Sequence, residues 1–66
     1  MRIDRMKLNL QLAASCMLIK DVCERAGISQ PTLRKIRSGE RNPKPATIGK
    51  IAKALNVKVQ DIIIKE

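Results

Sequence analysis

The absence of every aromatic residue is the feature that most constrains how this chain can fold. No Phe, Tyr or Trp occurs among its 66 residues, so a core can be built only from Leu, Ile, Val, Met and Ala. A chain of this length buries only about 60% of the surface that its unfolded form exposes, so its stability margin is small. These facts predict one small domain, residues 1–66, held together by aliphatic contacts.

The residue inventory argues against catalysis. The chain has no His and only two Cys, whereas His is the commonest general acid or base and metal sites are built largely from His and Cys. We therefore expect no enzyme activity, metal, cofactor or small-molecule ligand. Cys16 and Cys23 do not form a CxxC motif. They are predicted to be small buried side chains in a reducing cytoplasm, rather than a disulfide or redox pair.

The charge indicates a polyanionic partner. Fourteen Lys and Arg residues against six Asp and Glu give a net charge of +8. Residues 29–53 contain seven basic residues and one acidic residue, which places +6 of that charge in one segment. Nucleic acid is the first candidate partner, and an anionic membrane or an acidic protein is the second. No apolar run approaches the length needed to span a membrane.

Residues 4–14 allow two readings. Leu8, Leu10 and Leu12 alternate with polar residues, which is typical of a strand. A helix is favoured because Asp4 is a good N-cap and the segment is rich in helix-forming Leu, Lys, Gln and Ala. The predicted inner face of this helix consists of Met6, Leu10, Ala13, Ala14 and Met17.

Further short helices are predicted along the rest of the chain. Residues 19–26 repeat apolar side chains at helical spacing, and Gly27 is suited to end that helix. Residues 30–37 follow, capped by Ser29 or Gln30, with Pro31 in the first turn. Residues 39–45 read as a loop, 46–55 as an amphipathic helix, and 59–63 as a short last helix or a strand.

Two short helices joined at a glycine, the second of them basic, are typical of a helix-turn-helix over about residues 19–38. The chain also resembles the Cro/phage-repressor-like (XRE family) helix-turn-helix regulators from about Met6 to Ile63. The resemblance rests on the stretch SGERNPKPATIGKIAKALNV and on Val22, Cys23, Ala26, Gly27, Ile28, Leu33 and Ile36. It implies an all-α bundle of about five helices that binds operator DNA, usually as a homodimer, in the cytoplasm, encoded by a bacterium or by a phage or other mobile element.

The second helix of the motif carries the predicted base contacts. Similar proteins read a base with a glutamine that matches Gln30, and a glutamine can form a pair of hydrogen bonds with adenine. Lys35 is expected to donate to guanine, and Arg34 to guanine or to a phosphate. Pro31 either packs against a thymine methyl group or only starts the helix. Thr32 is the weaker candidate.

Phosphate contacts are expected on both sides of these base contacts, so affinity should fall steeply with salt. The candidate phosphate ligands are Ser29, Ser38, Arg41, Asn42 and Lys44. Four further lysines are expected to be solvated surface: Lys50, Lys53, Lys58 and Lys65.

The chain departs from the family at three places. Leu18 and Ile19 stand where a Ser or Thr cap and a phosphate-binding Gln are usual. Arg37 replaces a glutamate that often pairs with an arginine on the first helix. Leu12 stands at the position that matches this arginine, so Arg37 should be free to face DNA or solvent. Lys58 replaces the usual cap of the last helix.

Together these observations predict a sequence-specific regulator of transcription, foremost a repressor, with helix 30–37 in the major groove. The alternative is an antitoxin-like or adaptor module that uses the same fold to hold a protein partner. The tail VKVQDIII is the predicted dimer contact, because its three consecutive isoleucines cannot all face one core.

Overall fold

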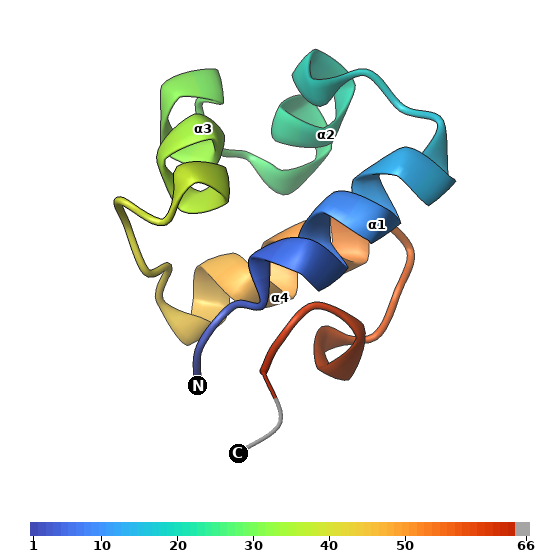
Figure 1. The fold of residues 1–66 in the computed structure, drawn as a ribbon. Helices are drawn as coiled ribbons and strands as arrows, with labels where there is room; N and C mark the ends of the chain where they lie inside the picture. Colours follow the sequence, from blue (N-terminus) through green and yellow to red (C-terminus); the bar gives the residue numbers. More distant parts are fainter. Residues whose placement is uncertain (65–66) are drawn as a thin grey trace.

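Four α-helices and one terminal turn make up the fold, which the computed structural model describes over residues 1–64. The elements are α1 (Arg5–Ser15), α2 (Ile19–Ala26), α3 (Gln30–Ser38), α4 (Pro45–Ala54) and the 3-10 turn η1 (Val59–Asp61). α2 packs on α4, and α1 packs on α3 and η1, so the helices enclose one core (Figure 1). The predicted all-α fold is confirmed. Lys65, predicted to be solvated, lies outside the described residues.

Residues 59–63, predicted to be a short helix or a strand, contain features of both. η1 is a single helical turn, and the segment after it is extended enough for Ile63 to form an antiparallel bridge with Ile3. Asp61 replaces the missing cap at Lys58, because its carboxylate accepts a hydrogen bond of 3.0 Å from the Lys58 backbone N–H. The bridge joins the segment before α1 to the segment after η1.

Local signals set most helix boundaries. The Asp4 carboxylate caps α1 by accepting from the backbone N–H groups of Met6 and Lys7, at 3.0 and 3.2 Å. Gly27 and Gly39 end α2 and α3 in left-handed backbone, with φ of 70° and 85°. A residue with a Cβ is disfavoured in this conformation, which explains the choice of glycine at both places.

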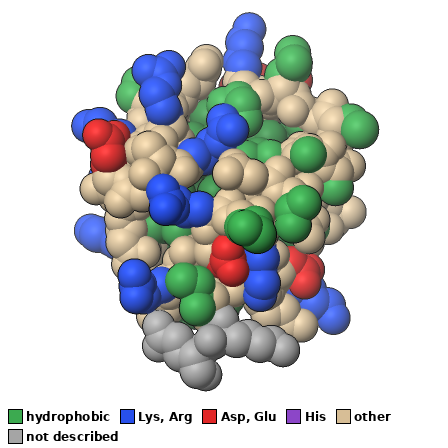
Figure 2. All heavy atoms as spheres, viewed as in Figure 1, with side chains coloured by type: hydrophobic (Ala, Val, Ile, Leu, Met, Phe, Trp, Pro, Cys, Tyr) green, Lys and Arg blue, Asp and Glu red, His purple; other side chains and the backbone are tan. Residues whose placement is uncertain are grey.

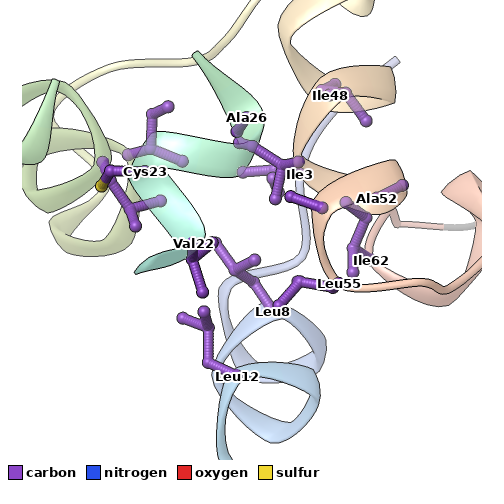
Figure 3. Close-up of a cluster of buried hydrophobic side chains, with 14 residues drawn as sticks. Ile3, Leu8, Leu12, Val22, Cys23, Ala26, Ile48, Ala52, Leu55 and Ile62 are labelled. Atoms are coloured by element: carbon purple, nitrogen blue, oxygen red, sulfur yellow. The ribbon is translucent and has the colours of Figure 1, made fainter. Parts of the chain in front are cut away.

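The core is entirely aliphatic apart from one cysteine (Figure 3). Leu8 and Leu12 of α1 point toward Val22 of α2, and Leu55 closes the cluster from the end of α4. The apolar side chains that recur at helical spacing in α2 and α4 pack in this core, with Ile28 at its edge. Its buried side chains are Ile3, Leu8, Leu12, Val22, Cys23, Ala26, Leu33, Ile36, Ile48, Ile51, Ala52, Ala54, Leu55 and Ile62.

The predicted inner face of α1 was wrong for Met6, Leu10, Ala13 and Ala14, which are exposed, although the helix itself is present and Met17 packs against the core. Leu8 and Leu12 are buried, whereas Met6 is 75% exposed and Leu10 is 62% exposed. The helix carries large apolar side chains on two sides, and only one side can face the core. The rotation is set by neighbours distant in sequence: Ile3 pairs with Ile63 just before α1, and the Asp4 N–H donates to the Ile62 carbonyl at 2.9 Å.

The two cysteines have different environments, so the prediction that both are buried was half wrong. Cys23 is buried, and this burial raises the pKa of its thiol, which stays protonated at neutral pH. Cys16 is exposed and forms the left-handed end of α1, with φ of 56°. A helix end in this conformation normally favours glycine.

Cys16→Gly should raise the free energy of unfolding by about 0.5–1 kcal/mol. The substitution relieves a left-handed conformation that costs a non-glycine residue roughly 1–2 kcal/mol, and loses about 0.5–1 kcal/mol through the greater entropy of the unfolded chain. Urea denaturation measures the difference. Asn56→Gly is the matched control: Asn56 has φ of 58°, but asparagine tolerates this region, so its gain should be smaller. A loss of stability in Cys16→Gly would contradict the argument.

Candidate nucleic-acid interface

The start of α3 is fixed by a serine cap. Ser29 Oγ accepts a hydrogen bond of 3.2 Å from the Thr32 backbone N–H, and lies 2.7 Å from Thr32 Oγ1. Ser29 is therefore the cap, and Gln30 and Pro31 form the first turn. The two hydroxyl groups are engaged with each other and Thr32 is half-buried, so it is less available to a base than its exposed neighbours.

Buried Leu33 and Ile36 hold α3 against the core and turn its opposite side to solvent. Four of the five predicted base-reading residues are exposed on this helix: Gln30, Pro31, Arg34 and Lys35. A helix whose amino-terminal half exposes amide and cationic side chains has the chemistry that major-groove reading requires.

The loop after α3 is tied back to the helix. The Arg41 N–H donates to the Lys35 carbonyl at 3.3 Å, and Pro43 is buried beneath the loop. Ser38 Oγ donates either to the Lys35 carbonyl at 3.0 Å or to the Glu40 carboxylate at 3.2 Å. The Ser38 hydroxyl is thus already occupied, whereas Arg41 keeps its exposed guanidinium.

A hollow of about 290 Å³ brings together the predicted phosphate ligands of the loop. Arg41, Asn42 and Lys44 form its polar rim, while Ser29 and Ser38 are not part of it. Thr47, which the sequence pattern did not single out, also lines it. The remaining lining residues are Ile28, Thr32, Ile36 and Pro43.

Arg37 has a partner on α1, so the prediction that it is free was wrong. Its Nε donates to Asn9 Oδ1 at 3.2 Å, and Leu12, predicted to lie opposite, is buried in the core. The rotation of α1 that buries Leu8 and Leu12 brings Asn9 to the surface beside α3. A hydrogen bond from a charged guanidinium to a neutral amide therefore links α1 to α3 where the family often has an ion pair.

The start of α2 lacks the polar group that is usual there, as its sequence indicated. Leu18 is the N-cap, makes no side-chain hydrogen bond to the helix and is 70% exposed. A side chain without a polar atom cannot hold a phosphate, so Leu18 offers no side-chain ligand for one. Cationic side chains are spread over the face shown in Figure 2, with exposed hydrophobic side chains between them.

Comparisons with known proteins agree with this geometry. A family described as helix-turn-helix matches residues 1–62. The chain belongs to this XRE-type helix-turn-helix family. Membership supports a role in DNA-binding regulation of transcription, which is not an enzyme class. No curated protein sequence matches the chain.

A solved structure has the same fold. The restriction-modification controller protein C.AhdI from Aeromonas hydrophila superimposes with a TM-score of 0.81 over 86% of each chain, at 19% sequence identity. Its similarity supports the arrangement of the helices in this protein. Within residues 1–64, no helix has the length and apolar character needed to cross a membrane.

Proposed function

We propose that the protein is a sequence-specific regulator that binds duplex DNA with α3 in the major groove and acts as a repressor. The observation that carries the proposal is the exposed amino-terminal half of α3, which belongs to a helix-turn-helix and places Gln30 at its first position. The major groove is about 12 Å wide, which matches the diameter of a helix with its side chains.

Gln30 is the main reader in this proposal, with hydrogen bonds to adenine N6 and N7. Lys35 lies about one turn further along the helix and donates to guanine O6 or N7, and Arg34 reaches guanine or a nearby phosphate. Pro31 packs against a thymine methyl group. Thr32 contributes least, because its hydroxyl is held by Ser29.

The backbone contacts follow the same surface. In the loop after α3, Arg41, Asn42 and Lys44 bind DNA phosphates. Ser29 and Ser38 lie at the two ends of α3, where the two DNA strands would pass. Ser38 would have to exchange its hydrogen bond to Lys35 or Glu40 for one to DNA. Arg41 is therefore the strongest phosphate ligand in this set.

Arg41→Ala should weaken binding to all duplexes alike and reduce the slope of log K against log salt by about one. Fluorescence anisotropy with a selected and a scrambled duplex, between about 50 and 200 mM salt, measures both effects. Lys53→Ala removes the same charge from the last turn of α4 and should leave the slope nearly unchanged. A loss confined to the selected duplex would instead assign Arg41 to base reading.

The regulator is proposed to act as a homodimer through its apolar tail. Ile62 is buried and Ile63 half-buried, but Ile64 is 40% exposed at the end of the described chain. Selection of binding sites from random duplex DNA at two salt concentrations tests the proposal as a whole. A palindromic consensus supports a dimeric specific binder, a single half-site supports a monomer, and no enrichment rejects sequence-specific binding.

An antitoxin-like or adaptor role is the second candidate. It is favoured by the exposure of Met6 and Leu10 on α1, which a DNA contact on α3 does not explain. A protein partner bound mainly by these apolar side chains would show little dependence on salt, whereas DNA binding depends strongly on it.

A further inference from the structure

A second hollow lies at the carboxyl end of α3, on the other side of the loop, and has a volume of about 320 Å³. We call it the arginine hollow because three arginines, Arg2, Arg5 and Arg41, take part in its wall. No carboxylate is among the described residues that line it. The other lining residues are Ile3, Ile36, Ser38, Gly39 and Asn42.

Arg5 is hydrogen-bonded to the end of α3 at this hollow. Its Nη1 donates to the Ser38 carbonyl at 2.8 Å, at the last turn of α3. A Cβ at Gly39 would lie only 2.8 Å from the same nitrogen, so the glycine leaves the space that Arg5 occupies. A guanidinium has several other N–H donors in one plane, which remain for an anion.

Arg2 is brought to the hollow by pairing between the two ends of the chain. The Arg2 carbonyl accepts from the Ile64 N–H at 2.9 Å, and Ile3 forms a bridge with Ile63. This pairing uses backbone atoms, so the Arg2 side chain can be changed without removing it. Arg41 is held separately by its own backbone bond to Lys35.

Three like charges converge here from segments that are far apart in the sequence. Their mutual repulsion is relieved by an anion between them. Arginine suits a phosphate group in particular, because its planar fork can donate two parallel hydrogen bonds to the phosphate oxygens. The hollow shares Arg41 and Asn42 with the loop's other hollow, so an anion bound here lies next to the proposed DNA-binding surface.

We propose that the arginine hollow binds a phosphodiester of the DNA backbone, which makes the segment before α1 part of the DNA interface. The inference rests on the proposed function, because the phosphodiester is that of the duplex bound by α3. It adds Arg2 and Arg5 to the contacts and gives the paired chain ends a role: they position a phosphate ligand.

Arg2→Gln tests the proposal. It should reduce the slope of log K against log salt by about 0.9, with equal losses on selected and scrambled duplexes. Lys53→Gln is the matched control for the change in charge, since Lys53 is exposed in the last turn of α4. Arg2→Lys keeps the charge but not the fork, so it should keep the salt slope while losing part of the affinity. Amide spectra of the variants establish that each is folded.

The outcomes separate this inference from the proposed function. If the wild type binds duplex DNA and Arg2→Gln behaves like Lys53→Gln, the inference is overturned and DNA binding stands. If the wild type binds no duplex, both fall. A second experiment is an NMR titration with inorganic phosphate, monitored through the arginine Nε–Hε resonances. Shifts of Arg2 and Arg5 with inorganic phosphate but not with the duplex would identify a free-anion site and also overturn the inference.

Discussion

Replacing Leu8 by alanine should lower the free energy of unfolding by about 2–5 kcal/mol. Leu8 is fully buried in the aliphatic cluster, so the substitution removes its apolar contacts and leaves a cavity. Stability of about 0.05–0.15 kcal/mol per residue gives a chain of this size only about 3–10 kcal/mol in total. The substitution should therefore remove a large fraction of the total stability, as measured by urea denaturation followed by circular dichroism.

Leu10→Ala is the matched control for this prediction. It makes the same chemical change in the same helix, but Leu10 is 62% exposed, so stability should change by no more than about 0.5 kcal/mol. The two substitutions also test the rotation of α1. If the helix were buried through Met6 and Leu10, Leu10→Ala would lower the stability more than Leu8→Ala. Equal losses at both positions would indicate that Leu10 is covered in solution, for example by a second copy of the chain.

Boundaries of the helices could be predicted because their signals are local. Asp4, Ser29 and the two glycines at the ends of α2 and α3 act on backbone groups within a few residues of themselves. The same holds for the exposed side of α3, because buried Leu33 and Ile36 fix which residues face outward. Gln30, Arg34 and Lys35 could therefore be placed on a solvent-facing surface from the sequence.

Contacts between distant segments could not be predicted in this way. The bridge between Ile3 and Ile63 joins two ends that carry no complementary pattern, yet it helps to set the rotation of α1. That rotation in turn buries Leu12 and presents Asn9 to Arg37. The error in the inner face of α1 and the error at Arg37 thus have one physical origin.

The same reasoning explains why the arginine hollow was not visible in the sequence. Its charge comes partly from Arg2 and Arg5, which lie outside the basic segment at residues 29–53. Only the folded chain brings them to Ser38 and Arg41. Charge density along a sequence identifies a basic segment, but the shape of a phosphate site depends on which segments meet.

Gln30→Ala should remove discrimination at one base pair of the binding site, at a cost of about 1–3 kcal/mol. Gln30 is exposed at the first position of α3, where its amide can donate to and accept from one adenine. Alanine removes this pair of hydrogen bonds without changing the charge, so the salt dependence should stay as in the wild type. Affinities for a selected duplex and for its single-base-pair variants measure the effect.

The base pair that Gln30 reads can be identified by measuring both the wild type and Gln30→Ala on each single-base-pair variant of the duplex. At that position alone, the wild type should prefer one base pair and Gln30→Ala should bind all four about equally. At every other position the two proteins should keep the same preferences, because additivity holds for contacts that do not touch. Arg41→Ala provides the contrast, since losing a phosphate contact lowers all affinities together. Equal losses of Gln30→Ala on selected and random duplexes would show that Gln30 reads no base, and would move specificity to Arg34 or Lys35.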